Sequence, residues 1–164
     1  GGFLAVQQYT SHMSGIVSMI ADHMVLGGLA VVVQGLAALL SFVAGAATSA
    51  SLINFGRRTH LASEFALPLM VEAVLLLAFG LLGANLENLR WFYVPGTVML
   101  LCYIMGLQNA MITKVSKSEI RTTHVTGMVT DIGIELGKLF YWNLAHEDKA
   151  GTPPVRADRG KLIV

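Results

Sequence analysis

Long apolar runs, interrupted by short charged segments, dominate the chain and predict membrane-spanning helices. No Asp, Glu, Lys or Arg lies between Asp22 and Arg57, a gap of 34 residues. A second charge-free run covers 91–113, and Glu72 is the one charged residue in 65–86. About 20 apolar residues cross the hydrocarbon core of a bilayer, and Gly27–Gly28 divides the longest run. We therefore predict helices over 10–26, 29–54, 64–84, 92–113 and 123–143.

The composition agrees with a membrane protein. Of the 164 residues, 54% are hydrophobic and 13% are charged, and the mean hydropathy is +0.64, whereas soluble domains contain about 25% charged residues. A disordered tail, a disulfide scaffold and a nucleic-acid-binding module do not fit these values, and the net charge of +1 requires no polyanionic partner. We expect an all-α protein, a polytopic transmembrane helix bundle surrounded by the lipid bilayer.

Basic residues cluster in two of the segments between the apolar runs. Arg57 and Arg58 lie in one, and Lys114, Lys117 and Arg121 lie in another, while the segment between them, 83–90, contains one acid and one base. Short loops rich in Lys and Arg remain in the cytoplasm. The predicted helices over 64–84 and 92–113 would therefore cross away from the cytoplasm and back.

One sequence motif occurs twice, at an offset of 112 residues. Residues 10–21 are T-S-H-M-S-G-I-V-S-M-I-A and residues 122–133 are T-T-H-V-T-G-M-V-T-D-I-G, with five identities and three Ser/Thr exchanges. Internal repeats define many transporter folds. The polar segment 106–110 precedes the second copy, and its counterpart would fall before residue 1. We therefore expect a fragment that is truncated at both ends.

Two arrangements of this internal repeat remain open. If the helix over 10–26 spans the membrane, the halves are parallel. Half one would then cover about 1–55, a linker helix about 64–84 and half two about 92–164, within one transmembrane domain over 1–164. If the first helix is instead a short re-entrant segment, the halves are inverted. We expect the parallel arrangement.

The motif pair, T-S-H-M-S-G and T-T-H-V-T-G, is accompanied by G-L-Q-N-A about a dozen residues ahead of the second copy. Together these segments resemble the YoaK family of bacterial inner-membrane proteins, and the resemblance covers nearly the whole chain. One departure is Ile16, where members of that family usually have Asn. The resemblance implies a multi-pass protein of the bacterial inner membrane. It implies no activity, because that family is known mainly as a domain of unknown function.

Small and hydroxyl-bearing residues of each motif fall on one helix face. Two explanations remain open: such a stripe lets helices pack closely, or it lines a polar path. His12 and His124 occupy equivalent positions and are candidates for binding a solute or a proton, while Gln108 and Asn109 place amides inside an apolar span. The predicted binding residues are Ser11, His12, Ser14, Gly15, Gln108, Asn109, Thr123, His124, Thr126 and Gly127.

Three acids lie within predicted spans. A charged side chain at the bilayer centre costs on the order of several kcal/mol unless it is paired or faces water, so such acids are functional candidates. We predict Glu72, Asp131 and Glu135 as candidates for proton coupling, with a structural pair of Glu135 and Lys138 as the alternative. We expect no catalytic residue, metal site or cofactor, since the chain has no phosphate-binding glycine loop and no redox cysteine pair.

These observations predict a small permease or exporter for a small polar solute, with proton coupling as a further expectation. An intramembrane enzyme that uses His and Asp as acid and base is one alternative. A non-catalytic assembly or sensor protein, whose small-residue stripes serve oligomerisation, is the other. The expected partners are the bilayer, a small-molecule solute and, for the last alternative, further copies in a homo-oligomer; no nucleic acid is expected.

Overall fold

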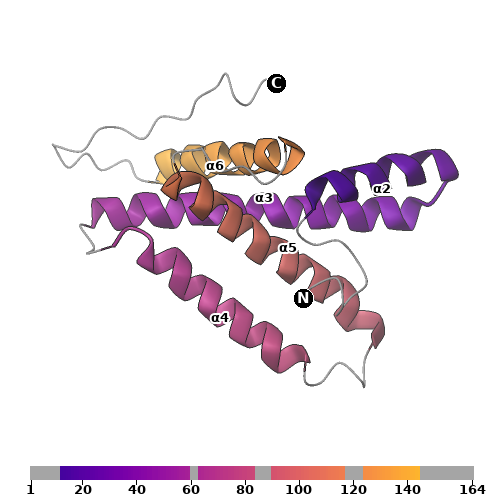
Figure 1. Ribbon diagram of the computed structural model, residues 1–164, viewed down its shortest axis with the longest axis horizontal. Helices are drawn as coiled ribbons and strands as arrows, with labels where there is room; N and C mark the ends of the chain where they lie inside the picture. The colour runs from indigo at the N-terminus through magenta and orange to yellow at the C-terminus, as the bar shows by residue number, and fades with distance from the viewer. Residues whose placement is uncertain (1–11, 60–62, 84–89, 117–123, 145–164) are drawn as a thin grey trace.

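The computed structural model describes residues 12–59, 63–83, 90–116 and 124–144 (Figure 1). These residues form helices, and none of them lies in a strand, so the predicted all-α class is confirmed for them. The helix bounds lie within a few residues of the predicted ones wherever both ends are described. In chain order the helices are α2 (Met13–Leu26), α3 (Leu29–Arg58), α4 (Ala66–Gly83), α5 (Arg90–Val115) and α6 (His124–Leu144).

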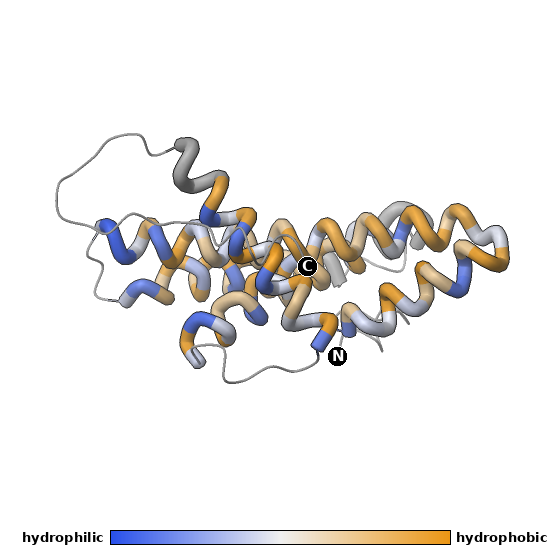
Figure 2. The backbone as a smooth tube through the Cα atoms, turned by 90° about the horizontal axis from the view of Figure 1, so that it is seen from above, coloured by the Kyte–Doolittle hydropathy of each residue, from blue (hydrophilic) through white to orange (hydrophobic). Residues whose placement is uncertain are grey.

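Helix α3 is the central element, and each of the other four helices contacts it. Figure 1 shows α2 and α6 along one side of α3, with α5 crossing it and α4 beyond α5. In Figure 2, hydrophobic positions predominate in the hairpin of α2 and the first half of α3, with polar positions between them. Such helices are apolar on more than one face, which is typical of helices in a large core or a membrane.

The predicted break within the longest apolar run is confirmed at Gly27 and Gly28. Gly27 caps α2 in the left-handed region, with φ of 77°, which glycine adopts without steric cost. The N–H of Gly28 donates to the carbonyl oxygen of His23 at 2.9 Å, and Gly28 is the N-cap of α3. The chain therefore reverses within two residues, and α2 packs back along α3.

Glycines bring α3 and its neighbours into backbone contact. A Cβ atom on Gly106 of α5 would lie under 3.0 Å from the carbonyl oxygen of Phe42, and one on Gly45 of α3 would lie equally close to that of Tyr103. Gly133 and Gly137 of α6 meet the α3 backbone in the same way. Small residues at helix contacts permit this close approach. At these four glycines, small residues therefore serve close helix packing.

Helices α5 and α6 both run in the same chain direction as α3. Along α5, Met99 accepts a hydrogen bond from Ser41 at 2.7 Å, and Lys114 donates to Asn54 at 3.4 Å, so residue numbers rise together on the two helices. Along α6, Gly133 packs against Val43 and Ala46, whereas the carbonyl oxygen of Gly137 accepts from Ser51 at 3.3 Å. Both helices therefore point toward the basic end of α3.

Helix α2 runs the other way. Met13 at its start packs with Phe42, and Ile20, two turns later, packs against Gly35. The two helices that begin at the repeated motif therefore run in opposite directions along α3 (Figure 1). Equivalent helices of parallel halves would run the same way, so this pair does not show the expected parallel arrangement, and the internal repeat itself stays a prediction. The reason is the tight reversal at Gly27, which sends α2 back against α3.

The basic ends of α3 and α5 lie together. Lys114 contacts Asn54, and Arg57 donates a hydrogen bond to Glu64 in the segment that leads to α4. Two basic segments on the same side of the protein were predicted, and the described part of each agrees. On α6, Lys138 Nζ forms an ion pair with Glu135 Oε1 at 2.6 Å.

We expect the Arg57–Glu64 pair to make a small, acid-sensitive contribution to stability. The hydrogen bond from Arg57 lowers the pKa of Glu64 below its usual 4.5. A lowered folded-state pKa stabilises the fold above pH 4.5, and this contribution is lost as the pH falls through the folded-state value. Half of the Arg57 side chain is exposed, so screening by solvent limits the contribution of the pair to stability to about 0–1 kcal/mol.

The melting temperature of Glu64→Gln in detergent measures this contribution. The variant should melt slightly below the native protein at pH 7, and the difference should be smaller at the lowest pH that the fold tolerates below 4.5. An equal difference at both pH values would contradict the assignment.

Candidate functional site

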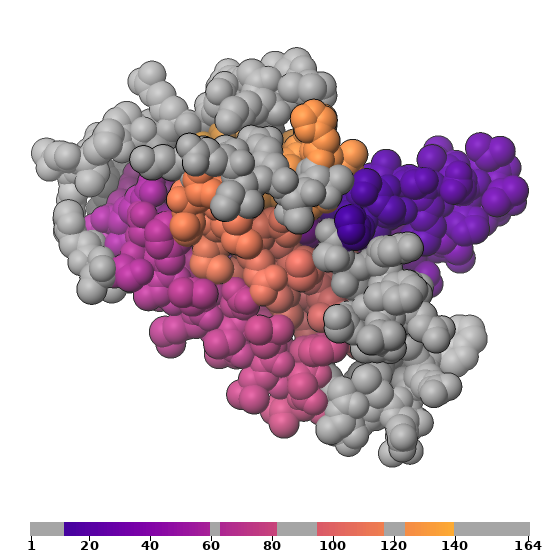
Figure 3. Space-filling model, viewed as in Figure 1, coloured from indigo at the N-terminus to yellow at the C-terminus, as the bar shows by residue number. Residues whose placement is uncertain are grey.

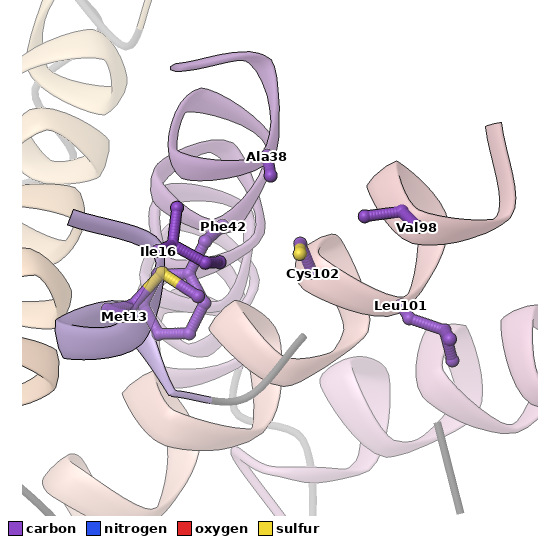
Figure 4. Packing of buried hydrophobic residues seen from close by; sticks show 7 residues of the cluster. All are labelled: Met13, Ile16, Ala38, Phe42, Val98, Leu101 and Cys102. Carbon is purple, nitrogen blue, oxygen red and sulfur yellow. The ribbon is translucent and has the colours of Figure 1, made fainter. Parts of the chain in front are cut away.

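The first turns of α2 and α6 meet beside the middle of α3. Met13 and Ile16 of α2 pack in one buried cluster with Phe42, the fourteenth of the 30 residues of α3, and Val125 and Val129 of α6 pack against the same cluster. Figure 4 shows Met13 and Ile16 beside Phe42, with residues of α5 completing the cluster. We call this meeting point of the two helix starts the junction.

Both copies of the repeated motif start a helix at the junction. His12 is the N-cap of α2, and His124 is the first residue of α6; both side chains are exposed. Ser14, Gly15 and Gly127 lie in the first turns and are half-buried. Two predicted binding residues, Ser11 and Thr123, lie outside the described residues. The structure thus brings the two copies together at helix starts, with the helices running away from each other.

Backbone donors are concentrated at the junction. The first N–H groups of any helix have no acceptor within that helix. No side chain caps α2, because His12 forms no capping hydrogen bond. Neither first turn contains an acid. A helix start also carries the positive end of the helix dipole, so both helices present positive potential to the junction, and α2 presents N–H groups that no side chain caps.

Thr126 adds a buried hydroxyl with no partner. Its side chain is 3% exposed, and its Oγ1 forms no hydrogen bond. Thr130, one turn further and 1% exposed, is satisfied, since its Oγ1 donates to the Thr126 carbonyl oxygen at 2.7 Å. Thr126 lies in the first turn of α6, the turn that meets α2 and α3 at the junction. An unsatisfied buried hydroxyl costs about 1–3 kcal/mol, and a bound molecule would remove that cost.

The two predicted amides are not at the junction. Gln108 donates a hydrogen bond from Nε2 to Glu72 of α4, and among the described residues α4 contacts neither α2 nor α6. Asn109 donates from Nδ2 to the carbonyl oxygen of Met105 in its own helix at 2.7 Å. Glu72 and Gln108 therefore form a separate polar contact between α4 and α5.

The acids of α6 lie away from the threonine face. Gly133 and Gly137 face α3, and helical spacing places Thr126 and Thr130 on that face and His124 and Asp131 on the far side. Asp131 is half-buried and has an interaction partner. Glu135 is 3% exposed and accepts from Lys138 at 2.6 Å, so the ion pair named in the structural alternative is present. Within the described ranges, no three His, Cys, Asp or Glu residues form a metal-binding group.

One buried amide was not predicted. Asn54 of α3 is 5% exposed, its Oδ1 accepts from Lys114, and its Nδ2 has no partner. Sequence reasoning treated 29–54 as an apolar span and overlooked its last residue. A single Asn near the end of such a span was the available signal, because a buried amide usually has a hydrogen-bond partner.

Comparison with known proteins assigns the chain to a family but gives it no activity. A family model with the description "Protein of unknown function (DUF1275)" matches residues 1–164. No curated protein and no solved structure matches the chain. The resemblance to the YoaK family stays a prediction.

Proposed function

We propose that this chain, which belongs to the DUF1275 family of proteins of unknown function, is a multi-pass permease of the bacterial inner membrane for a small polar solute. The observation that carries the proposal is the junction, where two helices begin head to head beside the middle of a helix long enough to span a bilayer. The solute would bind at the junction, between the first turns of α2 and α6.

The membrane location is supported by helix length and by surface composition. Among the described residues, Leu29–Arg58 and Pro95–Val115 are long and apolar enough to cross a bilayer. Large apolar side chains also face outward, among them Leu40 at 67% and Leu77 at 65% exposed. Soluble proteins rarely expose extended apolar surface. In Figure 3, α2 with the first part of α3 projects at the right, and α4 lies along the lower left; both carry much of this surface.

The length of α2 supports a site inside the membrane. With 14 residues, α2 rises about 21 Å at 1.5 Å per residue, less than the roughly 30 Å of hydrocarbon. Helix α6 begins near the level of Phe42, about 18 Å before the level of Asn54, where α5 ends. Helices that start at mid-membrane leave donors that protein, water or solute must satisfy. Discontinuous helices of this kind form the binding sites of many transporters.

A solute-flux assay tests the proposal. The full-length protein is reconstituted in liposomes, and exchange of labelled amino acids, sugars, short carboxylates and inorganic ions is measured against empty liposomes. We expect at least one solute to exchange saturably. If none exchanges while the protein is folded and inserted, the permease proposal fails, and an assembly or sensor role takes its place.

We propose Glu72 as the acid that couples transport to protons. It is the one charged residue of α4, and it accepts a hydrogen bond from Gln108. We expect Glu72→Gln to keep this hydrogen bond through its amide oxygen but to lose the titratable group. Uptake driven by a pH gradient should fall at least about tenfold, while solute exchange without a gradient persists.

Gradient-driven uptake and exchange are compared in the same liposomes, with Glu64→Gln, outside the helices, as the matched control. Unchanged gradient-driven uptake in Glu72→Gln would transfer the coupling role to Asp131 or Glu135.

A further inference from the structure

We infer that the solute bound at the junction is a small anion, with one negative charge on oxygen or a halide. The inference rests on the proposed function and names the chemical class of its substrate. It stands on two independent observations: the head-to-head helix starts, and the buried Thr126 hydroxyl that has no partner.

The electrostatics of the junction favour one negative charge. Each helix start is equivalent to roughly half a positive charge, so two starts together present about one. No acid in either first turn neutralises them, and no side chain caps α2. Positive ends in a medium of low dielectric constant repel each other strongly. A bound monoanion would remove that repulsion, whereas a cation would increase it.

The donors at the junction suit the same ligand. The first-turn N–H groups donate only, and the hydroxyls of Ser14 and Thr126 can each donate one hydrogen bond. Gly15 and Gly127, next to these hydroxyls in both motifs, have no side chain and leave the backbone open to close approach. Helix starts with free N–H groups are established anion-binding elements in proteins.

The nearest acids do not oppose this assignment. Asp22 lies in the last two turns of α2, away from its start, and Asp131 lies two turns into α6, on the side away from Thr126. Glu135 is a further turn away and is paired with Lys138. No carboxylate of the described residues therefore faces the junction from the first turn of either helix.

Binding to the purified full-length protein tests the inference. Sodium chloride, nitrate, formate, acetate and bicarbonate are titrated at constant ionic strength against sodium gluconate, a bulky reference anion, and neutral glycerol and cationic choline serve as further probes. Melting temperature and isothermal calorimetry report binding. We expect at least one small monoanion to raise the melting temperature saturably. Thr126→Val should weaken its binding about 10- to 100-fold, the loss expected for one hydrogen bond to a charged group.

Thr130→Val is the matched control, because Thr130 is equally buried and already satisfied within its helix. Thr126→Ser keeps the hydroxyl and should keep binding, which guards against a folding defect in Thr126→Val. Binding of neutral or cationic probes alone, or no binding of any anion, would overturn the inference. Flux of a neutral solute without anion binding would leave the permease standing, whereas anion binding without flux would leave the inference standing and remove the permease.

Discussion

Thr126→Val is expected to reduce solute exchange and, in the absence of solute, to raise the melting temperature. Valine has nearly the shape of threonine and lacks the hydroxyl that lies buried and unpartnered in the first turn of α6. Removing an unsatisfied buried group relieves a cost of about 1–3 kcal/mol. The same change removes a ligand donor, so exchange in liposomes should fall at least about tenfold. A residue important only for packing would not lose function and gain stability together.

Thr130→Val provides the comparison within the same helix. Its hydroxyl bonds to a carbonyl oxygen of its own helix, so the loss should change stability by less than about 1 kcal/mol and leave exchange intact. Equal loss of exchange in both variants would show that the threonine face of α6 is needed for packing against α3, and would contradict a specific role for Thr126.

Gly106→Ala is expected to prevent correct packing of α3 and α5. A methyl group on Gly106 would lie under 3.0 Å from the carbonyl oxygen of Phe42, which is backbone and cannot move aside as a side chain could. Overpacking of a core costs about 1–3 kcal/mol where side chains adjust, and we expect more than about 3 kcal/mol here. The folded, monodisperse fraction in detergent, measured by size-exclusion chromatography, should fall sharply, as should the melting temperature.

Gly96→Ala, in the same helix, is the matched control. Nothing lies within 4 Å of a Cβ atom at Gly96, and alanine favours the helix by roughly 0.5–1 kcal/mol relative to glycine. The control should therefore melt at the native temperature or slightly above it. If Gly106→Ala behaves like Gly96→Ala, the backbone contact between α3 and α5 is absent in the protein.

Much of the fold could be predicted from the sequence because its signals are local. Charge-free runs predicted the helices, and Gly27–Gly28 predicted the break between α2 and α3. The relative direction of α2 and α6 could not be predicted, because the motif looks the same whether its helices run together or apart. That direction depends on where α2 packs along α3, and Ile20 against Gly35 is a contact between positions without a shared sequence signal.

The candidate site was predicted in part. The repeated motif located the junction, because a histidine, a hydroxyl and a glycine recur at equivalent positions. The amides of Gln108 and Asn109 were grouped with it on depth alone, and depth does not determine which helix a side chain faces. In the structure Gln108 bonds to Glu72 of α4. The special position of Thr126 was also beyond the sequence, since Thr130 looks equivalent until its hydrogen bond is known.

Disulfide trapping in the full-length protein in membranes reports whether the two motif helices meet head to head. In a Cys102→Ala background, Met13→Cys with Val125→Cys pairs the two helix starts, and Ile20→Cys with Ile132→Cys pairs equivalent positions two turns later. We expect oxidation to link the first pair and to leave the second unlinked, as scored by mass spectrometry. Linkage of the second pair, or failure of the first, would contradict the head-to-head arrangement.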